Sequence, residues 1–418
     1  MIHPQKQIFS LVKKYMKARN AALRPKRVTV SWPVYDHREI QHALATLLEL
    51  RISQGAKVRE FEKEFARYIG VTYAVAVNSG SSANLIALAA LVESGDVPRG
   101  SEVICPAATF ATVASPIIQL GLIPVYADVD PVSWNIDPKE VEKAVTKKTR
   151  VIMPVHHLGN PADMPAILKI AKKHKLKVLE DCCEAHGAAI GREKVGSFGD
   201  MGTLSFFVAH NITTGEGGMV FTNSKKYYEI LLSLREFGRI PPHMLSRFRF
   251  KDPILGEYDT RYVFSRLGYN VRMTDIAASL GIEQLKKLDA LNRKRLAIVH
   301  RYQKGLAKYR TWLRLPEIRK NTFHSFYGYG LIIEKGAPFT RREFTQFLEA
   351  RGVETRAFFA GCLPDQPGFR DQPKKIIGKL PVSRWIRDNA IFIGCHPALT
   401  KQHVAQVLHA FGDFFKTK

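Results

Sequence analysis

Apolar positions recur along this chain with the spacing expected of strands that alternate with helices. Short apolar or β-branched runs cover 73–77, 103–106, 124–128, 150–155, 178–180 and 202–208. Between them, apolar residues three and four positions apart predict helices over 85–92, 109–120, 138–145, 164–174 and 225–235. This alternation is typical of an α/β fold, with a mostly parallel sheet and helices on both of its faces.

The two ends of the chain follow other patterns. Helical spacing covers 8–16, 37–50 and 58–69 before the first strand, and strand-like and helical stretches mix after a charged helical run at 292–309. A chain of 418 residues also exceeds the usual size of one domain core. We therefore predict a basic N-terminal helix and tether over 1–30, a large α/β domain over 31–290 and a small C-terminal α+β domain over 291–418.

Composition narrows the class of protein. The chain is 45% hydrophobic, yet no apolar run approaches the roughly 18 residues of a membrane helix. The N-terminus lacks the apolar core of a secretory signal, and the five cysteines form no disulfide framework. We expect a soluble enzyme of the cytoplasm with no membrane partner.

The charge of the chain is its least usual property. A formal net charge of +25 attracts anionic partners such as nucleotides and phosphates. The first 35 residues hold eight lysines or arginines and no acidic residue, a pattern for which a solvated basic helix is a simpler interpretation than a binding arm. No zinc-finger, RNP or homeodomain pattern is present, so nucleic acid is not the expected partner.

Candidate chemistry gathers where predicted strands end. The run at 178–180 leads into Asp181, and a second run is followed by His210 and the Gly-rich 214–218. Acidic groups and glycines at strand ends suit a ligand pocket. Upstream, the small residues 78–84 open a helix, whose free N–H groups and dipole favour a phosphate, although such residues also serve as ordinary helix caps.

The stretch 178–223 resembles the cofactor core of the DegT/DnrJ/EryC1/StrS family of pyridoxal-phosphate (PLP) sugar aminotransferases. In that family the motif S-F-x-x-x-K carries the lysine that forms a Schiff base with the cofactor. The same frame here runs from Ser205 and Phe206 to His210, so histidine stands in place of the lysine. The resemblance implies a fold type I PLP-dependent transferase, similar to aspartate aminotransferase, whose large domain binds the cofactor.

The resemblance also implies roles for individual residues. It assigns Ser81, Ser82 and Ser205 to the cofactor phosphate, Phe110 to the face of the pyridine ring, Asp181 to the ring nitrogen and Glu184 to the ring hydroxyl. Asn270, in a G-x-N-x-R-M segment, would reach the site of the partner subunit in a homodimer. On the residues alone, Phe110 is equally well a core side chain and Asp181 a helix cap.

The histidine at 210 selects one branch of that family. An imidazole can accept a proton but, unlike a lysine amine, cannot form an imine with an aldehyde. The chain is thus similar to the dehydratases that use pyridoxamine phosphate (PMP) to remove the C3 hydroxyl of a nucleotide-linked 4-keto-6-deoxyhexose in deoxysugar and lipopolysaccharide O-antigen synthesis. In that branch the histidine is the catalytic base, and glutamate can restore PMP. The nucleotide and the hexose stay open.

One feature of the branch is missing. Its CDP-type members hold an iron–sulfur cluster on cysteines that follow an R-x-x-G-R segment, where this chain has Ile240-Pro241-Pro242-His243-Met244 and no cysteine between Cys183 and Cys362. A [2Fe–2S] cluster normally takes four thiolates, so we expect no cluster. Two alternatives remain: an aminotransferase that uses another lysine, such as Lys194, and a catalytically idle basic relative that binds nucleotide or nucleic acid.

Overall fold

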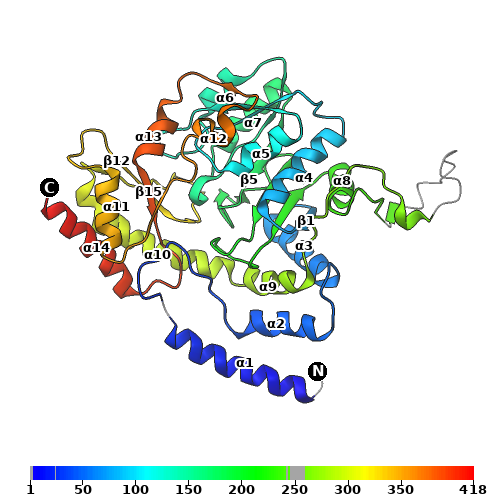
Figure 1. Cartoon of the computed structure of the whole chain (residues 1–418), viewed down its shortest axis with the longest axis horizontal. Helices are drawn as coiled ribbons and strands as arrows, with labels where there is room; N and C mark the ends of the chain where they lie inside the picture. Colours follow the sequence, from blue (N-terminus) through cyan, green and yellow to red (C-terminus); the bar gives the residue numbers. More distant parts are fainter. Residues whose placement is uncertain (1–2, 24, 242, 245–258) are drawn as a thin grey trace.

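The computed structural model describes residues 3–23, 25–241, 243–244 and 259–418. Its centre is an eight-stranded sheet (Figure 1). In spatial order the strands are β1 (Tyr73–Val77), β9 (Gly218–Thr222), β8 (Met201–Ser205), β5 (Lys177–Asp181), β4 (Thr149–Ile152), β2 (Glu102–Pro106), β3 (Ile123–Ala127) and β14 (Lys375–Ile376). Strand β9 is antiparallel to β1 and β8, and the other neighbours are parallel.

Both faces of this sheet are buried because successive side chains of a strand point to opposite sides. Val75 and Val77 of β1 pack in the core formed with α4 (Gly80–Glu93), α5 (Ala111–Gln119) and α8 (Lys225–Arg235). Ala74 and Ala76 face the opposite core. There α3 (Ala56–Ile69) and α9 (Asp275–Leu285) cover one part of the sheet, and α6 (Pro138–Ala144) and α7 (Met164–His174) cover another.

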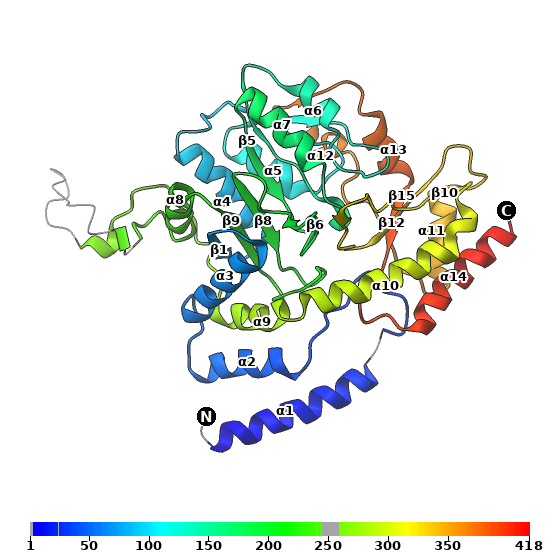
Figure 2. The same ribbon diagram turned by 180° about the vertical axis from the view of Figure 1, so that it is seen from behind.

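A second, antiparallel sheet lies beyond the long helix α10 (Leu288–Leu306), as Figure 2 shows. Its order is β10 (Leu313–Arg314), β12 (Tyr329–Ile333), β15 (Ala390–Ile393) and β13 (Thr355–Ala357). Strands β10, β12 and β15 share a core with α10, α11 (Arg341–Ala350) and α14 (Lys401–Lys416). The N-terminal segment joins this part of the molecule, since Val28 bridges to Val353.

The predicted α/β class is confirmed, with a mostly parallel sheet flanked by helices. The predicted division at residues 30 and 290 stays a prediction. Several boundaries differ, two of them beside the cavity. The helix expected from residue 85 begins at Gly80, because Ser79 caps it, and the strand expected over 202–208 ends at Ser205, because Phe207 and Val208 line a cavity instead.

The N-terminal helix is longer than the periodicity indicated. Helix α1 spans His3–Ala22 and packs along α2 (His37–Leu48) (Figure 1). In the part of the chain that the structure describes, no helix combines the length and the apolar character needed to cross a membrane. Pro242, in the segment that replaces the cluster cysteines, lies outside the described residues.

Candidate active site

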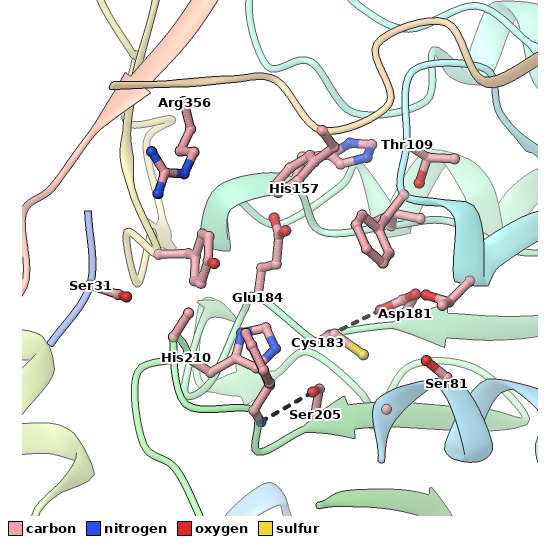
Figure 3. A pocket seen from close by; sticks show the side chains of 18 of the residues that line it. Ser31, Ser81, Thr109, His157, Asp181, Cys183, Glu184, Ser205, His210 and Arg356 are labelled. Atoms are coloured by element: carbon pink, nitrogen blue, oxygen red, sulfur yellow. Dashed lines mark hydrogen bonds between the residues drawn. The ribbon is translucent and has the colours of Figure 1, made fainter. Parts of the chain in front are cut away.

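A cavity of about 790 Å³ opens where β2, β4, β5 and β8 end. Ligands of open α/β sheets bind at the carboxyl ends of the strands, and this volume falls within the range of about 300–1,000 Å³ usual for ligand pockets. Figure 3 shows Ser81, Asp181 and Ser205 on one side of the cavity and Ser31 and Arg356 on the other, with Glu184 between them.

Asp181 is the last residue of β5 and is 4% exposed. The side-chain amide of Asn84 donates to one carboxylate oxygen over 2.8 Å, and the backbone N–H of Cys183 donates to the other over 3.0 Å. Thr203 in turn donates to Oδ1 of Asn84 over 2.7 Å. These contacts hold the carboxylate in one orientation in the cavity wall. There it can accept a hydrogen bond from a protonated ring nitrogen.

Glu180, the acidic residue before Asp181, has a structural role. Glu180 is fully buried on the other side of the strand, where it accepts the backbone N–H groups of Gly196, Phe198 and Gly199. Its Oε2 also lies 3.1 Å from Nε2 of His156. Of these two adjacent acidic residues, only Asp181 lines the cavity; Glu180 fixes the loop after β7 (Glu193–Lys194).

The amino end of α4 supplies the anion-binding side of the cavity. Ser79 caps the helix by accepting the N–H of Ser82 over 3.1 Å, and Ser79, Gly80 and Ser81 line the cavity together with Ser205 of β8. Helix N–H groups and serine hydroxyls are donors suited to a phosphate. Ser82 does not line the cavity; its hydroxyl donates to Asn78 over 2.6 Å.

His210 follows β8 in a short turn and is partly buried in the cavity wall. Its ring lies 5.3 Å from that of Tyr327 and 5.6 Å from that of His186, between centroids. Burial, with a smaller contribution from the charge of Arg295, lowers the pKa of His210 to about 3. The low pKa keeps the ring neutral, and among the described residues nothing hydrogen-bonds its buried Nδ1, so this nitrogen is unblocked.

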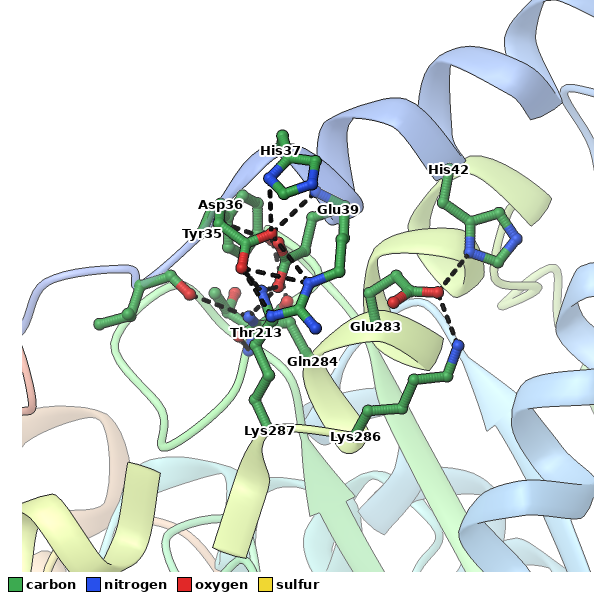
Figure 4. Close-up of polar contacts among 12 residues, drawn as sticks. Tyr35, Asp36, His37, Glu39, His42, Thr213, Glu283, Gln284, Lys286 and Lys287 are labelled. Carbon is green, nitrogen blue, oxygen red and sulfur yellow. Dashed lines mark hydrogen bonds and ion pairs between the residues drawn. The ribbon is translucent and has the colours of Figure 1, made fainter. Parts of the chain in front are cut away.

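A polar network holds the loop that follows His210 (Figure 4). The phenol of Tyr35 donates to the carbonyl of Thr213 over 2.9 Å, and the hydroxyl of Thr213 donates to the carbonyl of Phe206 over 2.8 Å. Behind them, Gln284 donates to the fully buried Glu39 over 2.7 Å. Gln284 of α9 also accepts the N–H of Thr213 over 3.4 Å. The loop after His210 is therefore held by α9 and by Tyr35, which precedes α2.

Glu184 projects into the middle of the cavity (Figure 3). Burial raises its pKa to about 8, and the nearby charge of Asp181 adds to the rise. A hydrogen bond from the backbone N–H of Leu158 to Oε2, 2.7 Å long, opposes this rise in pKa. Glu184 is thus a neutral acid at pH 7 and can donate a hydrogen bond to an oxygen of a bound group.

Six of the eight site residues predicted from sequence line this one cavity: Ser81, Phe110, Asp181, Glu184, Ser205 and His210. Asn270 lies outside it and accepts from Nε of Arg272 over 3.2 Å, so its role toward a partner subunit stays a prediction. The donors at α4, the fixed Asp181 and the free His210 nitrogen fit a pyridoxal-type cofactor.

Sequence reasoning missed three residues that shape the site. Asn84 orients Asp181, while Tyr327 and Arg356 line the cavity from the small sheet. Asn84 could have been found from the sequence, because it belongs to the small-residue stretch 78–84 that was predicted to open a helix. Nothing in the sequence pattern brought the segments of Tyr327 and Arg356 to the ends of the large sheet.

Comparison with known proteins places these residues in a family context. The model of the DegT/DnrJ/EryC1/StrS aminotransferase family matches residues 33–412. The lipopolysaccharide biosynthesis protein RfbH of Salmonella typhimurium is 36% identical, and the match covers 98% of each chain. The dTDP-4-dehydro-2,6-dideoxy-D-glucose 3-dehydratase of Saccharopolyspora spinosa is 37% identical over 92% of this chain and 86% of its own.

A solved structure extends the similarity to the fold. The GDP-4-keto-6-deoxymannose-3-dehydratase crystallised with a trapped PLP-glutamate geminal diamine superposes with a TM-score of 0.84. The two sequences are 28% identical, and the match covers 92% of this chain and 99% of the other.

Proposed function

The chain belongs to the DegT/DnrJ/EryC1/StrS aminotransferase family, and on that premise we propose that it removes the C3 hydroxyl of a nucleotide-linked 4-keto-6-deoxyhexose with the help of PMP. One observation carries the proposal: in the frame where the family has its lysine, His210 lies in the cavity wall with a free, neutral ring. The names of two similar proteins, both nucleotide-sugar 3-dehydratases, support it.

When bound, the cofactor supplies an amine that can condense with the ketone and a ring that withdraws electrons. His210, uncharged at cellular pH, takes a proton on the cavity side. Asp181, held by Asn84 and by the N–H of Cys183, orients the ring by accepting from its protonated nitrogen. Ser81 and Ser205, with the amino end of α4, bind the phosphate, and Ser82 supports them.

Phe110 and Glu184 complete the proposed cofactor site. Phe110 is 53% exposed at the cavity, so its ring is open to stack on a second ring. Glu184 donates from its protonated carboxyl to the ring hydroxyl. We further propose that glutamate restores the amine, as the name of the solved relative suggests, and that a homodimer of the cytoplasm acts in deoxysugar and lipopolysaccharide synthesis, with Asn270 reaching the partner's site.

The test begins with purified protein, PLP and L-glutamate. Borohydride should leave no PLP covalently attached to the chain by intact mass, whereas glutamate should convert the bound PLP spectrum to that of PMP. The loaded protein should then convert a nucleotide-linked 4-keto-6-deoxyhexose into its 3-deoxy ketone, detected as a loss of one oxygen (about 16 Da) from the sugar with PMP converted to PLP and ammonia released, in assays of the GDP, CDP and dTDP forms.

His210→Asn supplies the matched variant. It should retain PLP affinity while dehydration falls by about 10²–10⁴-fold, the usual contribution of a general base. A covalent PLP adduct on the wild-type chain would instead favour the aminotransferase alternative. A chain that binds no PLP would favour the idle relative.

A further inference from the structure

The cavity has a second end, opposite the amino end of α4. It is formed by Val30 and Ser31 of the N-terminal segment, by Glu354, Arg356 and Ala357 near β13, and by the rings of Phe359 and Phe392. Figure 3 shows Arg356 directed into the cavity from this side, across from Ser81 and Asp181. Ser81, Asp181 and Ser205, proposed to hold the cofactor phosphate and ring nitrogen, lie away from this end, whereas the ring of Phe110 lies 6.2 Å from that of Phe359, between centroids.

Arg356 is the only lysine or arginine among the described residues that line the cavity. Its side chain is 56% exposed, so a solute can reach the guanidinium. The guanidinium pairs with Glu354 and donates from Nη1 to the carbonyl of Thr355 over 3.0 Å. A guanidinium has five N–H donors, and these two contacts leave donors for a further acceptor.

Glu354 positions this arginine. Its Oε2 accepts the backbone N–H of Val30 over 3.0 Å, and its backbone N–H donates to the carbonyl of Val28 over 2.8 Å. Because the carboxylate is 14% exposed and tied to the N-terminal segment, it fixes the guanidinium at the cavity mouth instead of leaving it free in solvent. The planar guanidinium presents paired N–H donors that match the paired oxygens of phosphates and carboxylates.

We propose that Arg356 forms an anion subsite at the mouth of the cavity, which binds the oxygens of a nucleoside diphosphate or of a carboxylate. This inference rests on the proposed function, because both anions belong to it: the diphosphate of the nucleotide-linked sugar and the carboxylates of glutamate. The subsite lies at the far end of the cavity from the phosphate donors of α4, so cofactor and substrate anions are held apart.

The experiment measures binding and the half reaction separately on PLP-loaded protein. Titration calorimetry with GDP, CDP and dTDP, each compared with its nucleoside, reports on the diphosphate. The rate of spectral change with L-glutamate reports on the carboxylate. Arg356→Met should weaken one or both by about 10-fold or more, the usual loss for a hydrogen bond to a charged group, with PLP affinity unchanged.

Two further variants make the result decisive. Arg342→Met removes an exposed arginine of α11 outside the cavity and should change neither readout. Arg356→Lys keeps the charge but not the paired geometry, so it should give an intermediate loss, and it decides the matter if the methionine variant does not fold. Weaker diphosphate binding identifies the sugar nucleotide as the source of the anion, and a slower glutamate step identifies glutamate.

Unchanged diphosphate affinity and unchanged glutamate rate in both Arg356 variants would overturn the subsite. That outcome is distinct from failure of the proposed function. If no keto-sugar loses its C3 oxygen yet the anions still bind through Arg356, the dehydratase assignment falls and the subsite stands.

Discussion

Glu184 gives the site a titration near neutral pH. Because its pKa is raised from 4.5 to about 8, the folded protein keeps a proton that the unfolded chain releases between these values. The folded state then binds more protons than the unfolded state, so the free energy of unfolding falls as pH rises through this window. The neutral form also avoids a second negative charge beside Asp181.

Glu184→Gln should remove that dependence. Glutamine keeps an oxygen for the N–H of Leu158 but cannot ionise. Denaturant unfolding between pH 5 and 9 should show the free energy of unfolding falling more steeply in the wild type, by at most about 1.4 kcal/mol per pH unit for one proton. Parallel curves for the two proteins would show that Glu184 does not carry the shifted proton.

At the scale of single residues, the sequence predicted which side chains line the cavity better than it predicted what these side chains contact. Asp181 and His210 stand out because one ends an apolar run and the other follows the next, and both line the cavity. Their pKa values and hydrogen bonds depend on groups brought in by folding. The charge of Arg295 in α10, 85 positions further along the chain, helps to lower the pKa of His210, an effect that no local sequence pattern predicts.

Among the elements, the amino end of α4 and strand β9 approach so closely that no side chain fits between them. A Cβ added at Gly218, the first residue of β9, would overlap the carbonyl of Ser79 and lie 2.8 Å from the nitrogen of Gly80. Both obstacles are backbone atoms, so they cannot move aside as a flexible side chain would. The glycine lets the strand hold the helix end in place.

Gly218→Ala should therefore displace the phosphate side of the cavity. We expect it to lower the free energy of unfolding by about 1–3 kcal/mol, as overpacking usually does, and to weaken PLP binding. Gly368→Ala is the matched control, because a Cβ there meets nothing within 4 Å. Denaturant unfolding and an absorbance titration with PLP check both effects, and equal behaviour of the two variants would contradict this account of the contact.

Elements with a strong local signal were predicted closely, and those defined by pairing were not. The strand at 73–77 and the helices at 164–174 and 225–235 match their observed bounds, because their periodicity and caps are local. Strand β9 was not predicted as a partner of β1 and β8, and the two-residue strand β14 completes the sheet from a position far along the chain. Such pairings depend on distant segments meeting.

For the whole molecule, the distribution of the five cysteines bears on iron–sulfur chemistry. Cys105 and Cys362 lie in the core beneath α4 and α5, Cys395 in the core of the small sheet, and Cys182 in the core beside α3. Cys183 alone lines the cavity. The two adjacent cysteines face apart, since Cys182 packs by Gly196 and Cys183 by Gly80.

We therefore propose that the chain assembles no [2Fe–2S] cluster. Four thiolates must converge on such a cluster, whereas these thiols are divided among three cores and the cavity. Burial also raises their pKa values and disfavours the thiolate that binds iron. Anaerobic incubation with iron and sulfide, followed by desalting, should leave no visible cluster absorbance, with iron equal to that of Cys183→Ala. If the wild type binds stoichiometric iron and Cys183→Ala does not, the argument is refuted. A one-electron route for the reduction of the sugar would then be open again.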